Sequence, residues 1–139
     1  PTMLGKLFLL FAIIPVIEVV DCRMEGPIDA ADAVADNALA ARLVPGETAT
    51  DPRAVDVSME SVQVRKNARL VEAGTGAQVL GHPATAVSWL AEILSEQGAS
   101  VPAGQVVSTG SLTTAIPVEP GDVIEARFGT LGTVSVAFE

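Results

Sequence analysis

Apolar and polar residues alternate in several short stretches of this chain, a pattern typical of β-strands. Alternation begins at Val55 and continues to Val64, and a second strand-like stretch at 69–73 follows a polar turn at 65–68. Two such stretches joined by a short turn predict a β-hairpin. Between later glycine-containing turns, the same criteria predict strands at 105–109, 123–128 and 133–138.

Two other stretches have their apolar residues at helical spacing. Residues 28–43 predict a small-residue helix, with Asp29 and Asp32 in its first turn, where carboxylates favour the helix dipole. Its proposed packing face consists of Ile28, Ala31, Val34, Ala35, Ala38 and Leu39.

A second helix is predicted at 84–97. Pro83 suits the first helical position, where its missing N–H would be unbonded, and Gly98 is able to end the helix. The side chains expected to point inward are Val87, Leu90, Ala91 and Leu94, with Trp89 and Ile93 beside them. Strands outnumber helices, so the pattern predicts an α+β fold in a single domain, residues 1–139.

The most apolar stretch, residues 7–20, contains one carboxylate, Glu18. A buried, unpaired carboxylate is costly, so we interpret the stretch as a buried strand in which Glu18 has a partner. A hard divalent cation such as Mg²⁺ is the partner that a carboxylate oxygen suits best. The alternatives are a membrane span, which needs about 20 apolar residues, and a signal peptide, for which no cleavage pattern follows.

The composition of the chain makes nucleic acid an unfavourable partner. The chain has 139 residues, a net charge of −9 and only two lysines, so no basic face for nucleic acid is expected. Cys22 is the only cysteine, which fits a reducing, cytoplasmic location, and we expect it to serve packing rather than nucleophilic catalysis.

Few polar residues are candidates for chemistry. The turn at Gly110, Ser111, Leu112 and Thr113 follows an apolar stretch, and its hydroxyl and N–H groups could receive a substrate carboxylate, although such a turn can also be only a turn. His82, the only histidine, is expected to cap the turn before Pro83. Asp36 and Asn37 are poor helix formers within the first predicted helix, so they line a pocket or belong to a solvated face.

Six segments, in order and spacing, resemble the C-terminal half of the 2-keto-4-pentenoate hydratases and 4-oxalocrotonate decarboxylases of the fumarylacetoacetate hydrolase superfamily. They are Ile17-Glu-Val-Val-Asp-Cys-Arg23, Val34-Ala-Asp-Asn-Ala38, Leu80-Gly-His-Pro83, Ser108-Thr-Gly-Ser-Leu-Thr113, Val118-Glu-Pro-Gly-Asp122 and Leu131-Gly-Thr-Val-Ser-Val136. The resemblance runs from about residue 17 to residue 138. Residues 3–18 also resemble the first apolar segment of FxsA-type membrane proteins, and residues 1–16 are atypical of the hydratase family.

This resemblance implies a strand-rich mixed β-sandwich roll and a site for Mg²⁺ or Mn²⁺ held by three carboxylates. Glu18 matches one of them, and the other two come from an upstream Glu-x-Glu pair that does not occur in this sequence. The implied activity is a lyase reaction in aromatic catabolism, hydration of 2-hydroxypenta-2,4-dienoate to 4-hydroxy-2-oxopentanoate or of a similar small 2-oxo or 2-hydroxydienoic acid. Decarboxylation of the 4-oxalocrotonate type uses the same electron sink and is the alternative.

One carboxylate does not satisfy Mg²⁺, which prefers six oxygen ligands, and the family's upstream catalytic lysine has no counterpart here. We therefore expect an incomplete fold and negligible activity from the chain alone, or else a noncatalytic remnant or partner subunit. An incomplete sandwich leaves apolar surface uncovered, so we expect a homo-oligomer or a complementary subunit, with Trp89 or the N-terminal apolar stretch near a contact.

Overall fold

The computed structural model describes residues 12–139. In chain order, its strands and α-helices are β1 (Val16–Val20), α2 (Ala30–Ala35), β2 (Ala40–Pro45), β3 (Ser61–Lys66), β4 (Arg69–Thr75), α3 (Pro83–Glu96), β5 (Val123–Phe128) and β6 (Thr133–Ala137). Short 3₁₀ turns lie at Asn37–Leu39 and Gly76–Gln78. The content is α+β with strands dominating, as the sequence predicts.

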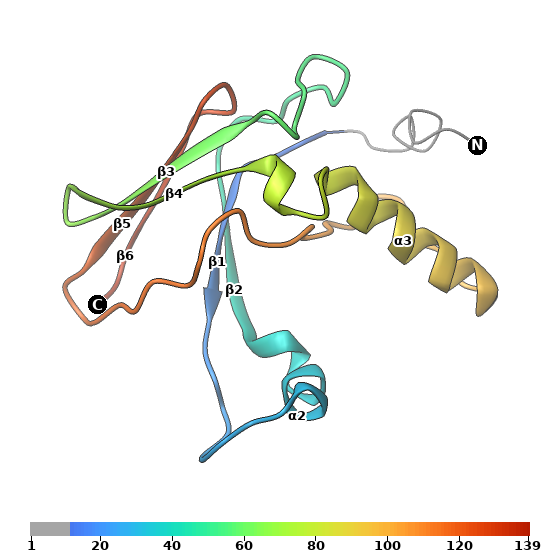
Figure 1. Cartoon of the computed structure of the whole chain (residues 1–139), viewed down its shortest axis with the longest axis horizontal. Helices are drawn as coiled ribbons and strands as arrows, with labels where there is room; N and C mark the ends of the chain where they lie inside the picture. The colour runs from blue at the N-terminus through green and yellow to red at the C-terminus, as the bar shows by residue number, and fades with distance from the viewer. Residues whose placement is uncertain (1–11) are drawn as a thin grey trace.

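The strands form two antiparallel units. Figure 1 shows a four-stranded sheet, in the order β4-β3-β5-β6, and a separate ladder of β1 with β2 that extends away from it to α2. At the base of the ladder, Gly46 lies close to Val134 of β6. Helix α3 projects in a different direction, away from the end of β4. The sheet is therefore the body of the fold, and the ladder and α3 are its two projections.

The predicted hairpin is β3 and β4. Its turn residues Asn67 and Ala68 have φ values of 51° and 66°, the left-handed pair that a two-residue hairpin turn requires. Asn67 also bonds across the sheet, because its side-chain oxygen accepts from the Val123 N–H at 2.9 Å. The local turn and this distant contact both favour the same strand pairing.

The core lies on one face of the four-stranded sheet. Its central cluster is Val62 and Val64 of β3 with Ile124 and Ala126 of β5, all buried. Apolar side chains from other parts of the chain pack against this cluster. Two of them are Ile17 of β1 and Leu112 of the segment after α3. The core thus joins three parts of the chain that are far apart in sequence.

A partly buried ion pair lies at one end of the sheet. The Asp122 carboxylate lies 2.8 Å from Lys66 Nζ and accepts hydrogen bonds from Asn67 Nδ2 and from the Glu119 N–H, each at 2.7 Å. The Lys66 ammonium, then Glu119 and Asn67, lower the pKa of Asp122 to about 2. These contacts connect the β3–β4 turn to the start of β5.

The second predicted helix is confirmed as α3. Pro83 occupies its first turn, and Nδ1 of His82 accepts a hydrogen bond from the Ala84 N–H at 3.0 Å, so His82 caps the helix as expected. Gly98 follows the helix with a φ of 70°, a left-handed conformation that suits glycine.

The predicted helix at 28–43 is wrong over most of its length. Only Ala30–Ala35 is α-helical, and Ala40–Pro45 forms strand β2 paired with β1. The Asp29 carboxylate does cap this short helix, accepting from the Asp32 N–H at 2.9 Å. The spacing of small apolar residues suits a helix, but residues 40–45 pair with β1 in an antiparallel ladder that has one register shift, between Val19 and Val20.

The strand predicted at 105–109 is also absent from the described part of the chain. These residues are irregular, and no strand pairs with them. None of the helices in residues 12–139 has the length and apolarity needed to cross a membrane. The predictions for residues 1–11 lie outside the described residues.

Candidate functional site

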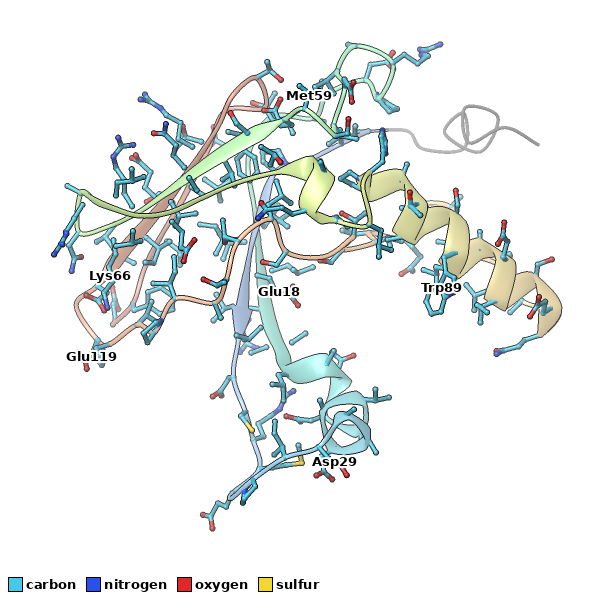
Figure 2. The ribbon with its side chains drawn as sticks, in the orientation of Figure 1. Glu18, Asp29, Met59, Lys66, Trp89 and Glu119 are labelled. Atoms are coloured by element: carbon cyan, nitrogen blue, oxygen red, sulfur yellow. The ribbon has the colours of Figure 1, made fainter. Side chains whose placement is uncertain are left out.

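Glu18 lies in the middle of β1, opposite Leu43 of β2, and Figure 2 shows its side chain leaving this strand. It is exposed, whereas its neighbours Ile17 and Val19 are partly buried. The expectation that Glu18 is a buried carboxylate is therefore wrong. Because β1 belongs to a two-stranded ladder, alternate side chains point to opposite faces and only one face is packed.

The exposed Glu18 carboxylate has no hydrogen bond or ion pair within residues 12–139. Within the described residues, no side chain or backbone group occupies this carboxylate. Burial does not account for Glu18. Its position is nevertheless defined, because the neighbouring residue Ile17 packs against the core.

The segment at Gly110–Thr113 lies where the chain returns from α3 to the sheet. Leu112 packs on the core, and its carbonyl lies so close to Gly74 of β4 that a Cβ on Gly74 would overlap it. Gly110 has a φ of 119° and lies beside Val79. The two ends of the segment are thus held by contacts with β4 and with the turn before α3.

The hydroxyls at this segment are available as donors. Ser111 is exposed and Thr113 partly buried, and among the described residues neither hydroxyl has a hydrogen-bond partner. Ser111 and Thr113 are the sequence neighbours of Leu112, which packs against the core. The segment therefore has two hydroxyls next to a residue that is held by packing.

Glu18 and Gly110–Thr113 flank the same core cluster. Ile17, next to Glu18, and Leu112, inside the turn, both pack against it. The fold therefore brings Ile17 and Leu112 to the same core cluster, while the Glu18 side chain lies on the opposite face of β1 from Ile17.

Residues 21–39, which connect β1 to β2 and contain α2, form an arm at the end of the ladder. One arginine holds this arm together. Arg23 Nε donates to Asp36 Oδ1 at 2.7 Å, and Arg23 Nη2 donates to the Asp36 carbonyl, also at 2.7 Å. The hydrogen bond from Arg23 lowers the pKa of Asp36. Asp36 thus serves the structure of the arm, and Arg23 is its partner.

Directly after Asp36 the backbone is left-handed at three residues in a row, Asn37, Ala38 and Leu39, with φ values of 55°, 53° and 64°. Such conformations cost energy for residues other than glycine, so the arm depends on Arg23 and on the β1–β2 ladder to hold them. The sequence predicted that Asp36 and Asn37 line a pocket or belong to a solvated face. It did not predict that a left-handed turn begins at Asn37. Cys22, expected to pack, is instead exposed at the start of the arm.

Two polar residues with structural roles were missed by sequence reasoning. Glu60 is buried and accepts three hydrogen bonds from Thr130 and Leu131 in the β5–β6 turn. Asp122 is also buried and pairs with Lys66. Each of the two directly precedes a strand with alternating apolar residues. That position was the only indication of their role in the sequence.

The described residues do not make a complete metal site. No group of three histidine, cysteine, aspartate or glutamate side chains is placed to hold an ion in the part of the chain from residue 12 onward. A lone carboxylate is insufficient for Mg²⁺. Residues 12–139 therefore do not form a complete site for such an ion by themselves.

The chain is similar to proteins of one family across nearly all its described length. Residues 12–138 match the family described as "Fumarylacetoacetate (FAA) hydrolase C-terminal". It is 42% identical over 127 residues to 4-oxalocrotonate decarboxylase of Pseudomonas sp. strain CF600, covering 91% of this chain and 48% of that protein. It is 36% identical over 128 residues to 2-keto-4-pentenoate hydratase of Paraburkholderia xenovorans strain LB400, with 91% and 48% coverage.

A solved structure is similar as well. 4-Oxalocrotonate decarboxylase from Pseudomonas putida G7, complexed with magnesium and adipate, superposes with a TM-score of 0.87 at 43% identity, covering 92% of this chain and 49% of that one. The chain spans about half the length of the relatives it matches.

Proposed function

Because this chain belongs to the fumarylacetoacetate hydrolase family, we propose that it carries the C-terminal part of a divalent-metal-dependent lyase site for a small 2-oxo or 2-hydroxydienoic acid. The observation that carries this proposal is the match of residues 12–138, at 36–42% identity, to relatives named as decarboxylases and hydratases of such acids. The fold that we propose for this site is a mixed β-sandwich roll.

In this proposal Glu18 is one ligand of Mg²⁺ or Mn²⁺. Its exposure and its lack of a partner among the described residues leave both carboxylate oxygens open to a cation. Since this part of the chain has no set of three ligands, the proposed site also needs ligands from residues outside 12–139. The magnesium and adipate bound to the similar decarboxylase support a metal beside a dicarboxylic ligand.

The turn at Gly110–Thr113 binds the substrate carboxylate. The Ser111 and Thr113 hydroxyls can donate to it, and a glycine at Gly110 lets the backbone approach closely. Leu112, packed on the core, keeps these donors in place. In a chain with net charge −9 such local donors are needed, because the overall field repels an anion.

The test is a chimera in which residues 12–139 replace the matching half of a 4-oxalocrotonate decarboxylase. We expect Mg²⁺-dependent turnover, and we expect Glu18→Gln to reduce both metal affinity and turnover at least about 10-fold. Glu25→Gln, at another exposed glutamate outside the strands, is the matched control and should keep full activity. A folded chimera that turns over neither class of acid would contradict the function, and a fully active Glu18→Gln chimera would remove Glu18 from the site.

Two reactions remain candidates within this proposal. Decarboxylation is favoured by identity, 42% to the decarboxylase against 36% to the hydratase. Hydration needs the same enolate-stabilising site with water admitted to the substrate. Assaying the chimera with 4-oxalocrotonate and with 2-hydroxypenta-2,4-dienoate distinguishes them, and the isolated chain should show negligible turnover of either acid.

A further inference from the structure

Glu72 is an acidic residue at a core-facing position of the sheet. In the antiparallel ladder of β3 and β4 it lies directly opposite Val64, and residues that are opposite in a ladder point to the same face. Val64 is buried in the core cluster, so Glu72 occupies a position where an apolar side chain would pack well. It is partly buried there, and a carboxylate in such a place needs a specific partner.

The partner of Glu72 is Thr114, which directly follows the proposed substrate turn at Gly110–Thr113. The Thr114 hydroxyl donates to Glu72 Oε1 at 2.6 Å, between residues that are 42 positions apart in the sequence. Thr114 is exposed, so water could satisfy its hydroxyl as well. The contact is therefore not needed to satisfy a buried hydroxyl. Its effect is to tie the end of the turn to β4.

A second contact joins the same two segments with the same spacing. Gly74 lies two positions after Glu72, on the same face of β4, and the Leu112 carbonyl lies where a Cβ of Gly74 would be. Leu112 and Thr114 are likewise two positions apart. The turn and β4 therefore meet in a matched, antiparallel register. Thr113 lies between the two fixed points, so these contacts limit where its backbone and its hydroxyl can lie.

We propose that Glu72 is a positioning residue for the substrate, because it holds Thr114 and thereby orients the Thr113 hydroxyl toward the substrate carboxylate. This inference rests on the proposed function of the turn at Gly110–Thr113. Glu72 acts through its acceptor oxygen and not through its negative charge, which opposes the binding of an anion. Lys66 and Glu72 line the same hollow, so the ammonium offsets part of that charge.

NMR relaxation of the backbone amides in the full chain tests the anchoring without an assay of function. We expect order parameters near 0.85 at Thr113 and Thr114, about the value for rigid backbone, and a fall toward about 0.6 in Glu72→Leu. Glu72→Gln keeps an oxygen that accepts from the Thr114 hydroxyl and should match the parent chain. Glu125→Leu, at a partly buried glutamate on the other face of the sheet, is the matched control and should change neither value. Unchanged order parameters in Glu72→Leu would refute the anchoring.

Kinetics of the chimera described above test whether the anchoring serves the substrate. We expect Glu72→Leu to raise KM about 3- to 10-fold, the effect of losing one hydrogen bond. Its kcat should stay within about 2-fold of the parent, because the carboxylate is bound equally in the ground and transition states. Glu72→Gln should keep the parent KM. Thr114→Val removes the donor of the same bond and should raise KM as Glu72→Leu does, with no further rise in the double variant.

A purely structural role of Glu72 predicts a different result. Leucine at position 72 adds apolar surface to the core face, so the urea midpoint of the Glu72→Leu chain should stay at or above that of the parent while KM rises. An unchanged KM in Glu72→Leu, or a KM in Glu72→Gln raised as much as in Glu72→Leu, would overturn the proposal. A folded parent chimera without turnover would instead contradict the proposed function, and the order parameters alone then decide whether Glu72 holds the turn.

Discussion

The buried carboxylate of Glu60 offers the sharpest test of how this fold is held together. It lies just before β3, is 5% exposed, and accepts from the Thr130 N–H at 2.6 Å, the Thr130 hydroxyl at 2.7 Å and the Leu131 N–H at 3.1 Å. Glu60→Ala removes the acceptor of all three donors. The contact joins residues 70 positions apart, so its loss should loosen β5 and β6 from β3.

The expected loss of unfolding free energy depends on whether water can replace Glu60 as the acceptor for each donor. Leu131 is buried, and an unsatisfied buried N–H costs about 1–3 kcal/mol. Thr130 is exposed, so water can replace Glu60 at its two donors and each loss costs roughly 0.5–1.5 kcal/mol. The sum is about 2–6 kcal/mol, which is large beside a typical unfolding free energy of about 5–15 kcal/mol.

Urea unfolding followed by far-ultraviolet circular dichroism measures this loss. With a slope of about 1–3 kcal/mol per molar urea, a loss near 4 kcal/mol lowers the midpoint by roughly 1–4 M. Glu25→Ala, at an exposed glutamate, should change the unfolding free energy by less than about 0.5 kcal/mol. Glu60→Gln keeps one acceptor oxygen and should fall between the two, which provides a measurable variant if Glu60→Ala does not fold. Equal stability of the Glu60→Ala and Glu25→Ala chains would refute the reasoning.

Two further perturbations probe the sheet. Lys66, then Glu119 and Asn67, hold the pKa of Asp122 at about 2 in the folded chain, below about 3.9 in the unfolded chain, so its stabilisation is complete above about pH 4 and is lost as the pH falls toward 2. Asp122→Asn should therefore lose stability at neutral pH and flatten the dependence of urea midpoints between about pH 4 and pH 2; an unchanged pH dependence would contradict this. Gly74→Ala places a Cβ against the Leu112 carbonyl and should cost about 1–3 kcal/mol in thermal unfolding, whereas Ala73→Ser, at its exposed neighbour, should melt close to the parent chain.

The elements that could be predicted from the sequence are those with local signals. Asn67, a residue type that tolerates the left-handed conformation, begins the β3–β4 turn, and β3 alternates exposed and buried residues from Ser61 to Val64. Helix α3 has both of its end signals, Pro83 with the His82 cap and then Gly98. In each case the determining interactions lie within a few residues, so a local pattern is sufficient.

The elements that could not be predicted depend on distant partners. Residues 40–45 have the small-residue spacing of a helix, but they pair with β1, whose residues lie twenty or more positions earlier. Residues 105–109 have strand-like composition but no neighbouring strand, so they stay irregular. Likewise nothing local to Glu60 indicates that its acceptors meet the β5–β6 turn. Pairing over such distances is set by the packing of the whole sheet, which a local pattern does not contain.

Glu18 shows how this limit affects the candidate site. An apolar neighbourhood in sequence suggested a buried charge, but alternation in a ladder packed on one face leaves Glu18 exposed while Ile17 contacts the core. A buried carboxylate without a partner would destabilise the fold, and neutralising it would stabilise the chain. An exposed one imposes no such cost, so Glu18→Gln should leave the unfolding free energy of the isolated chain within about 0.5 kcal/mol of the parent. If urea unfolding instead shows a gain above about 1 kcal/mol, the carboxylate is strained in the fold, and its proposed role as a freely available metal ligand loses its physical basis.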